Sequence, residues 1–511
     1  MNLIPSKSEY SVSYFCTWRT QNILAVMDGR AGARDMMDEQ RLLGPDGFVY
    51  GYADVRGDMY LVLDDGWDVD YGVSPDTGAA CFGSLEMSEQ KFPSVKGLPP
   101  AERLLLINQR VKSHGWKGIG LWVAAQRCAP DYDAPFKESD LAYWQERILW
   151  CREAGVEYWK VDWGTHAHDN AFRKALTGLA KHLYPALIIE HAACMLPLNA
   201  PEHPSDEFRG RYAGEQHANA IAREAIDFSD VFRSYDVISA LSVPTTLDRL
   251  SALLPLAKGL INGEDECYIN AALGCSLGVM RSHYDTEKIK EVGDDLAYRP
   301  DEVTAALRWQ RIAPPFAGTD VACSEEILFD QQYFAPGSTW YGSVHGKEVR
   351  QGAPAVIARN LPLDSVWVEG QEKPYVVASV HPNGAYSVSV QPRTLDGVRS
   401  YPGACVHCEI PDSVDTIGVL GVGCDVILHL PRVPEKVYVQ SLISDHAFEW
   451  IEGVQGKTIT ISKEFARRVF GSKDQSMPAL MLRVEWSDLG AGKNPLGGIL
   501  HTLRPKGQNS L

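Results

Sequence analysis

The sequence predicts a (β/α)8 barrel followed by a C-terminal antiparallel β-sandwich domain. Over residues 1–320, short apolar strand-like runs alternate with segments of helical spacing, which is typical of a parallel sheet with crossover helices. About eight such units in roughly 300 residues fit a closed barrel. No glycine-rich phosphate loop follows the first strand, as an open nucleotide-binding sheet would require. The pattern changes near residue 320, which predicts two domains, 1–320 and 321–511.

The barrel elements follow one another along the first domain. The predicted strands cover residues 60–64, 118–123, 156–162, 186–190 and 231–236. The predicted helices cover residues 99–113, 138–154, 170–183, 247–260 and 301–311. In the second of these, Trp144, Ile148 and Cys151 share one helical face. Gly155 follows directly and predicts a left-handed C-cap, because glycine adopts that conformation without steric cost.

The second domain consists of short alternating runs. They cover residues 365–368, 375–380, 386–390, 426–430, 436–439 and 458–461. Between two of them, the tight sequence Pro382-Asn383-Gly384 predicts a hairpin. Several short strands separated by turn residues are typical of a sandwich.

Charge and composition exclude several classes of partner. The chain carries 49 basic and 66 acidic side chains, a net charge of −17, which argues against nucleic acid and anionic membranes, because both are bound by clustered Lys and Arg. The sequence has no run of 18 consecutive apolar residues, so we expect no membrane-spanning helix. The eleven cysteines are scattered singly, and their odd number favours reduced thiols in a cytoplasmic compartment. The start lacks a signal-peptide pattern, although a leader already removed would leave no trace. Neither charge nor composition decides whether the chain forms a homodimer.

The second predicted strand ends in Asp64-Asp65-Gly66-Trp67. In a barrel, catalytic groups come from the carboxyl ends of the strands. Two adjacent carboxylates accept hydrogen bonds from hydroxyls, and an indole offers a face to C–H groups, so this sequence suits a neutral sugar. The alternative is an N-cap pair with a buried tryptophan.

On the fourth strand, Lys160 and Asp162 alternate with Trp159 and Val161. Successive side chains point to opposite faces, so we expect the lysine and the aspartate to point into the barrel. A nearby ammonium lowers the pKa of a carboxylate and keeps it ionised, as a carboxylate nucleophile requires. The alternative is a purely structural ion pair.

Two further strands bring candidates to the same rim. Alternation on the third strand turns Trp122 inward, either to stack on a sugar or to fill the core. The sixth strand carries Arg233 and ends at Asp236, a second carboxylate. Facing an ionised Asp162, this carboxyl would have a raised pKa, which suits a general acid. A helix cap is the alternative for Asp236.

In chain order, Asp-Asp-Gly-Trp, Gly-Leu-Trp, Lys-x-Asp and the Arg/Asp pair resemble the retaining α-galactosidase clan, glycoside hydrolase families 27 and 36. The resemblance covers residues 10–320 and extends to the attached β-domain. It implies that Asp162 is the nucleophile and Asp236 the acid/base. The substrate-binding residues that it implies are Asp64, Asp65, Trp67, Trp122, Lys160, Glu190, Cys194, Arg233 and Trp18.

Two departures from the family pattern concern specificity. Arg233 precedes Asp236 by three residues rather than four, which puts the two on opposite strand faces unless the strand bulges, and leaves the role of Arg233 in doubt. The family's Cys-Glu-Trp is replaced by Cys194-Met195-Leu196. Galactose itself is therefore in question, and arabinopyranose and N-acetylgalactosamine share its axial hydroxyl.

The resemblance implies a retaining exo-glycosidase that hydrolyses terminal α-D-galactosyl residues of an oligosaccharide or glycoside, with no metal and no cofactor. The alternatives are a relative of the same clan acting on another sugar, a transglycosylase, and a non-catalytic carbohydrate-binding relative. A metal-dependent hydrolase would use His166 and His168. The zinc-like spacing of Cys405, His407 and Cys408 lacks a second pair of ligands, so we expect no zinc there.

Overall fold

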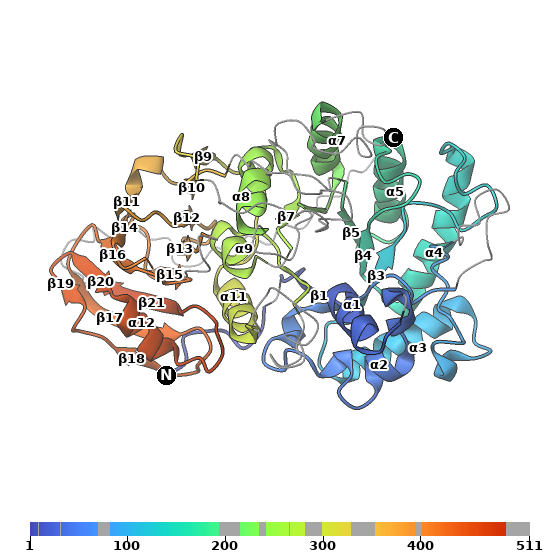
Figure 1. The fold of residues 1–511 in the computed structure, drawn as a ribbon, viewed down its shortest axis with the longest axis horizontal. Coiled ribbons are helices and arrows are strands. Elements are labelled where there is room, and N and C mark those ends of the chain that lie inside the picture. Colours follow the sequence, from blue (N-terminus) through green and yellow to red (C-terminus); the bar gives the residue numbers. More distant parts are fainter. Residues whose placement is uncertain are drawn as a thin grey trace, which may run out of the picture.

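The computed structural model describes residues 1–486 except residues 9, 31, 70–81, 194–214, 235–241, 265, 282–298, 329–352 and 394–400. Figure 1 shows a barrel and, beside it, a β-rich domain built from the C-terminal part of the chain. The two parts are those that the sequence predicts. Their division at 320/321 stays a prediction, although the strand that begins at Val321 already pairs with Arg359 of the β-rich domain.

The first part is a parallel eight-stranded sheet, with the order β7-β6-β5-β4-β3-β2-β1-β8. Its strands are β1 (Tyr14–Cys16), β2 (Tyr60–Leu63), β3 (Ile119–Val123), β4 (Tyr158–Val161), β5 (Ile188–His191), β6 (Val231–Arg233), β7 (Leu260–Asn262) and β8 (Gly278–Val279). An isolated parallel bridge between Asn262 and Ser276 links β7 to the residues just before β8. The sheet therefore closes on itself, and the predicted barrel is confirmed.

Alternation along each strand separates the two faces of the barrel wall. Outward residues such as Phe15, Leu61 and Trp159 belong to the large apolar core that the helices cover. Inward residues form a separate small apolar cluster, made of Tyr14, Cys16, Tyr60, Val62, Tyr158 and Met280. Because the period of a strand is two residues, the polar residues that share the inward register, Lys160 among them, point into the barrel.

Helices surround the sheet (Figure 1). They are α1 (Trp18–Met27), α2 (Glu39–Leu43), α3 (Pro100–Ser113), α4 (Leu141–Ala154), α5 (Asn170–Leu183), α7 (Glu215–Phe228), α8 (Ser242–Leu253), α9 (Cys267–Leu273) and α11 (Pro300–Ile312). Helix α5 covers the predicted range, and Gly155 caps α4 with a φ of +63°. The predicted helix 247–260 is wrong at its end: α8 stops at Leu253, one 3-10 turn follows, and β7 begins at Leu260. Pro255 lies in that turn and lacks the N–H that a continuing helix needs.

In its described residues, the β-rich domain contains two sheets, ordered β18-β17-β21-β15-β13-β12-β10-β9 and β11-β14-β16-β20-β19. Their strands are β9 (Val321–Cys323), β10 (Val356–Arg359), β11 (Val366–Gly370), β12 (Tyr375–Val380), β13 (Tyr386–Gln391), β14 (Ala404–Glu409), β15 (Thr416–Leu420), β16 (Asp425–His429), β17 (Pro434–Ser441), β18 (Ala447–Glu449), β19 (Val454–Gln455), β20 (Thr458–Ile461) and β21 (Ala479–Trp486), with helix α12 (Lys463–Phe470). Tyr386 of the first sheet and Cys408 of the second are both fully buried in the same apolar core, so the two sheets pack against each other.

The pairing of these strands corrects one feature of the prediction. The hairpin of β12 and β13 is antiparallel, with Gly384 at a φ of +87°, as predicted. Three pairs, however, run parallel: β10 with β12, β13 with β15, and β14 with β16. The domain is therefore mixed rather than wholly antiparallel. Alternation along one strand sets which side chains are buried but does not fix the direction of the neighbouring strand.

The two parts of the chain pack through α9 and through the N-terminal residues. The Ser387 hydroxyl donates to the Ala272 carbonyl of α9 at 2.7 Å, and the Tyr268 hydroxyl donates to the Met477 carbonyl at 2.8 Å. The N-terminus lies beside the β-rich domain (Figure 1), where the Ala447 N–H donates to the Met1 carbonyl at 2.8 Å. The barrel is thus held against the β-rich domain at both ends of its sequence.

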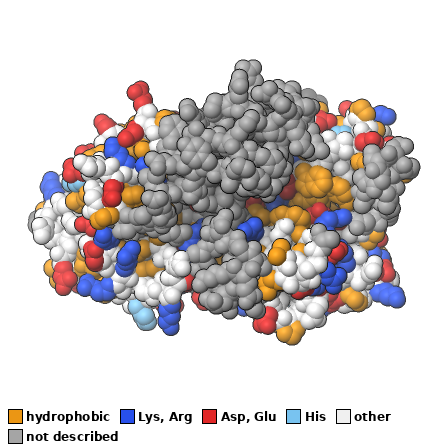
Figure 2. Space-filling view, viewed as in Figure 1, with side chains coloured by type: hydrophobic (Ala, Val, Ile, Leu, Met, Phe, Trp, Pro, Cys, Tyr) orange, Lys and Arg blue, Asp and Glu red, His pale blue; other side chains and the backbone are white. Residues whose placement is uncertain are grey.

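Nine cysteines lie in the described part of the chain, and all nine are free thiols, whereas Cys81 and Cys194 lie outside it. Among the helices of that part, none has the length and apolar character needed to cross a membrane. On the face shown in Figure 2, acidic and basic side chains are interspersed over the described surface.

Candidate active site

Charged side chains from several strands meet inside the barrel. The Lys160 ammonium on β4 lies 2.9 Å from Oδ2 of Asp64, the residue after β2, and 3.6 Å from Oε1 of Glu264, which follows β7. These partners come from different sides of the barrel, so Lys160 points into its interior, as alternation predicts. All three side chains are at most 3% exposed, which makes their mutual pairing necessary.

Asp162 is held at the end of β4 by a cation and by a hydrogen-bond donor. A terminal nitrogen of Arg233 lies 3.0 Å from Oδ1 of Asp162, and the Trp122 indole N–H donates to Oδ2 at 3.2 Å. Burial by itself raises the pKa of the Asp162 carboxyl, but the charges of Arg233 and Lys160 outweigh it and hold that pKa below its ordinary value. Asp162 is therefore an ionised carboxylate in a nearly dry site.

Arg233 points into the barrel and links three acidic residues. Besides Asp162, it contacts Oε2 of Glu264 at 3.1 Å and, more distantly, Oε1 of Glu190 at 3.8 Å. The doubt that the sequence raised about Arg233 came from its spacing to Asp236. Asp236 lies outside the described residues, so the face of the strand on which it lies stays a prediction. Arg233 itself points inward without any bulge in the strand.

The two adjacent aspartates have different partners. Oδ2 of Asp64 accepts from Lys160 and from the Cys16 thiol, both at 2.9 Å. Oδ1 of Asp65 instead accepts from the Arg34 guanidinium at 2.8 Å. Burial raises the pKa of Asp65 to about 7; Arg34 opposes this shift and the nearby Asp64 adds to it. Burial therefore favours the neutral form of the Asp65 carboxyl, against the charge of Arg34.

Glu190 on β5 is fully buried inside the barrel, next to Lys160 in the strand register. Its carboxylate accepts from the Tyr14 hydroxyl at 3.0 Å, from the Tyr158 hydroxyl at 2.8 Å and from the Asn262 amide at 2.9 Å. Burial raises the pKa of Glu190, although Arg233 opposes the shift. The sequence predicted that Glu190 binds substrate; the structure places it where protein donors already occupy both oxygens. Cys194, its predicted neighbour, lies outside the described residues.

The three tryptophans predicted to bind substrate occupy different environments. Trp122 points inward beside Asp162 and contacts the rings of Phe82 and Trp163. Trp67 is fully buried in the large apolar core, where its indole N–H donates to the Trp122 carbonyl at 3.1 Å. It therefore lies behind Trp122 and supports it. Trp18 begins α1 and is half-buried against the small inner cluster.

Several residues of the site were not predicted from the sequence. Glu264 follows β7, which has only three residues. The predicted helix 247–260 extended to the first residue of this strand, so no strand end was expected there. Arg34 lies in a 3-10 turn without any motif. Tyr14 and Asn262 share the inward register of their strands, and this register is the signal that could have identified them once β1 and β7 were recognised.

The metal alternative has little support among the described side chains. His166 Nδ1 lies 3.5 Å from Asp169 Oδ2, and its ring packs against Phe136 and Phe172. Within the described ranges, no three His, Cys, Asp or Glu residues are grouped as a metal site requires.

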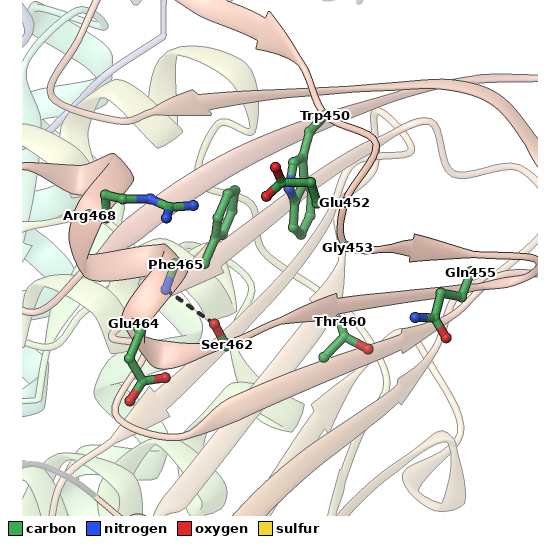
Figure 3. A pocket seen from close by; sticks show the side chains of 9 residues that line it. All are labelled: Trp450, Glu452, Gly453, Gln455, Thr460, Ser462, Glu464, Phe465 and Arg468. Carbon is green, nitrogen blue, oxygen red and sulfur yellow. Dashed lines mark hydrogen bonds between the residues drawn. The ribbon is translucent and has the colours of Figure 1, made fainter.

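A cavity of about 540 Å³ lies in the β-rich domain, between α12 and the segment after β18 (Figure 3). The rings of Trp450 and Phe465 stack on each other there, with centroids 4.1 Å apart, and Trp450 is only 5% exposed. Polar side chains such as Gln455 and Arg468 also line this cavity. The barrel, by contrast, contains a buried ionised carboxylate, that of Asp162, flanked by cations. This arrangement marks the barrel, and not the cavity, as the candidate active site.

No family model and no curated protein matches this sequence. Among solved structures, α-galactosidase I from Mortierella vinacea is 11% identical with a TM-score of 0.39, and the match covers 93% of this chain and 97% of that protein. The α-galactosidase from Saccharomyces cerevisiae is 9% identical with a TM-score of 0.42, covering 93% and 97%. A family 27 β-L-arabinopyranosidase from Geobacillus stearothermophilus, in complex with arabinose, is 10% identical with a TM-score of 0.40, covering 94% and 96%.

Proposed function

We propose that this chain is a retaining glycosidase that removes a terminal galactose-like sugar, with Asp162 as its nucleophile. The observation that carries the proposal is the placement of Asp162 at the carboxyl end of a barrel strand, between Arg233 at 3.0 Å and the Trp122 indole at 3.2 Å. Because these contacts keep a buried carboxylate ionised, it can attack an anomeric carbon at neutral pH. The neighbouring Asp64 and Asp65 supply acceptors for sugar hydroxyls.

The reaction would proceed by two displacements. In the first, a carboxylate oxygen of Asp162 forms a bond to the anomeric carbon while the glycosidic C–O bond breaks, and a general acid protonates the leaving oxygen. We assign this acid to Asp236 on sequence grounds. In the second, a water attacks the anomeric carbon, Asp236 takes its proton, and the bond to Asp162 breaks. A transglycosylase would replace this water with a sugar hydroxyl.

The charges of the site suit this cycle. When Asp162 becomes an ester it loses its negative charge, and Arg233 then keeps a negative partner in Glu264, 3.1 Å away. The guanidinium is therefore not left unpaired in a buried site, which would be costly. Lys160 is likewise held by Asp64 throughout. The two cations can thus stay in place while the nucleophile changes its charge.

The choice of sugar follows from Asp64 and Asp65. Side-by-side carboxyl groups suit two neighbouring hydroxyls, and the resemblance implies the 4- and 6-hydroxyls of galactose. Lys160 would contact a further ring hydroxyl. Arabinopyranose and N-acetylgalactosamine share the axial 4-hydroxyl and remain alternatives within the proposal.

The proposal is tested with nitrophenyl α-galactoside, β-L-arabinopyranoside and α-N-acetylgalactosaminide. Wild type should cleave at least one of them, and Asp162→Asn should lose at least about 1,000-fold in kcat. Asp415→Asn, on the β-rich domain, is a matched control that should retain activity, since Asp415 pairs with Arg483 at the surface. A 2-fluoro glycosyl fluoride of the cleaved sugar should add one sugar mass to Asp162.

The outcomes separate the alternatives. Full activity in Asp162→Asn would remove Asp162 from the chemistry. Sugar binding without cleavage of any substrate would identify a non-catalytic carbohydrate-binding protein. Loss of activity on addition of a chelator, restored by metal, would replace the proposal with a metal-dependent reaction.

A further inference from the structure

Trp163 is exposed at the mouth of the barrel, directly after Asp162. It is 46% exposed, whereas the neighbouring Trp122 is 1% exposed. Its position is fixed by the backbone: the Ala125 N–H donates to the Trp163 carbonyl at 2.8 Å. Gly164 follows with a φ of +144° and lies so close to Ala125 that a Cβ would come within 2.9 Å of the Ala125 backbone. A large apolar ring is thus held in solvent by a rigid segment.

This ring belongs to a continuous aromatic surface that reaches Asp162. The Phe82 and Trp163 rings lie 4.8 Å apart between centroids, at an angle of 44°. Trp122 lies 6.3 Å from Phe82 and 6.4 Å from Trp163, and its indole N–H binds the Asp162 carboxylate. Aromatic rings therefore lead from the proposed nucleophile outward to solvent.

The same surface is joined to the proposed sugar site on its other side. The Arg34 guanidinium lies 5.5 Å from the centre of the Phe82 ring and donates to Asp65 at 2.8 Å. This arrangement fixes the guanidinium between the ring and the carboxylate. A sugar bound by Asp65 and attacked by Asp162 would therefore lie beside this aromatic surface. The rest of the glycoside must project toward solvent, where Trp163 is the exposed ring and Phe82 packs against it.

We infer that Phe82 and Trp163 form an acceptor subsite that binds the ring of the leaving group of a glycoside. The inference rests on the proposed function and specifies its substrate class: glycosides whose leaving group is a six-membered ring with a face that can pack on an aromatic side chain. A pyranose presents axial C–H groups and an aryl group presents a π-face, and either packs on an indole. A short alkyl leaving group offers no such face, so it would gain little from this subsite.

Equilibrium binding of thioglycosides, which resist hydrolysis, tests the subsite separately from catalysis. Calorimetry would compare the methyl, phenyl and glucosyl 1-thioglycosides of galactose, arabinopyranose and N-acetylgalactosamine. In wild type, the phenyl or the glucosyl compound should bind about three- to tenfold more tightly than the methyl compound of the same sugar. Trp163→Ala should abolish this ratio with little change for the methyl compound, and Trp163→Phe should retain most of it.

Phe448→Ala provides a matched control, because Phe448 is a similarly exposed aromatic residue, 43% exposed, on β18 of the other domain. Its ratio should equal that of wild type. If only the phenyl compound binds more tightly than the methyl compound, the subsite binds aryl groups. If the glucosyl compound binds more tightly, the subsite binds a sugar. An unchanged ratio in Trp163→Ala, or equal binding of all three compounds in wild type, would overturn the inference. A further outcome is that wild type binds the phenyl or glucosyl compound more tightly through Trp163 and yet cleaves none of the nitrophenyl glycosides. That result would overturn the proposed chemistry and leave the subsite in place.

Discussion

Arg233 and Asp162 form an ion pair inside the barrel, with a terminal guanidinium nitrogen 3.0 Å from Oδ1 and both side chains at most 8% exposed. A buried pair of this kind is costly to assemble but still more costly to break, because one charge is then left without compensation. Glu264 sits on the other side of the guanidinium. The position of the proposed nucleophile therefore depends on a network that reaches from β4 through β6 to the end of β7.

Removal of the Arg233 charge should destabilise the protein and raise the pKa of Asp162. We expect Arg233→Met to lower the free energy of unfolding by about 3–5 kcal/mol, since Asp162 and Glu264 lose their shared cation. Arg233 lowers the pKa of Asp162, so the acid limb of the kcat/KM profile should move to higher pH. Urea unfolding and pH–rate profiles measure the two effects. Arg233→Lys should shift the limb less, and an identical profile in Arg233→Met would contradict the assignment.

Glu264 should act as a positioning residue for both cations. It contacts Arg233 at 3.1 Å and Lys160 at 3.6 Å, and it accepts from the Tyr14 hydroxyl at 3.1 Å. Glu264→Gln would leave these cations with fewer negative partners and shift the guanidinium toward Asp162. We expect a loss of kcat of up to about 100-fold, because small displacements of a reacting group have effects of that size.

The matched variant for Glu264 is Glu326→Gln, an exposed glutamate paired with Lys373 in the β-rich domain. It should keep wild-type kcat. Glu264→Asp should recover part of the activity, because it restores the charge. Equal kcat in wild type and Glu264→Gln, with an intact fold by circular dichroism, would show that Glu264 does not position Arg233.

Alternation along the strands predicted much of this site, but the network around it could not be predicted. The inward positions of Trp122, Lys160 and Asp162 follow from the two-residue period, which is a local property. Glu264 was missed because β7 has only three residues and adjoins a helix whose end depends on packing. The contact of Arg34 with Asp65 joins segments 31 residues apart, and nothing in the local pattern of either segment specifies such a contact.

The raised pKa of Asp65 should make stability fall as the pH rises. Burial raises this pKa to about 7 in the folded state, whereas an unfolded aspartate has a pKa of about 3.9. Between these values the folded state binds more protons, so folding is favoured at low pH and loses up to about 4 kcal/mol as the pH rises through 7. Asp65→Asn cannot ionise. Its stability relative to wild type should therefore increase from pH 5 to pH 8 in urea unfolding.

Asp415→Asn serves as the reference for the Asp65 experiment, because Asp415 is 45% exposed and pairs with Arg483 at the surface. Its stability relative to wild type should be almost the same at both pH values. A difference between Asp65→Asn and wild type that stays constant from pH 5 to pH 8 would show that Asp65 is ionised throughout this range.

Gly164 should be required for the placement of both Asp162 and Trp163. Its φ of +144° disfavours any L side chain, and a Cβ would lie 2.9 Å from backbone atoms of Ala125. The Ala125 backbone cannot move away freely, because both of its polar groups are hydrogen-bonded. Its N–H donates to the Trp163 carbonyl at 2.8 Å, and its carbonyl accepts from the His166 N–H at 2.8 Å. Gly164→Ala should therefore cost about 1–3 kcal/mol of stability and reduce kcat, because the segment after Asp162 must shift.

The control for Gly164 is Gly178, which lies within helix α5, where an added Cβ would meet no atom within 4 Å. Gly178→Ala should raise the free energy of unfolding by about 0.5–1 kcal/mol, because alanine loses less backbone entropy in a helix. The opposite signs of two identical substitutions separate local strain from a general effect of the added methyl group. If Gly164→Ala were as stable and as active as wild type, the Ala125–Trp163 segment would be free to adjust, and the rigid presentation of Trp163 would have to be abandoned.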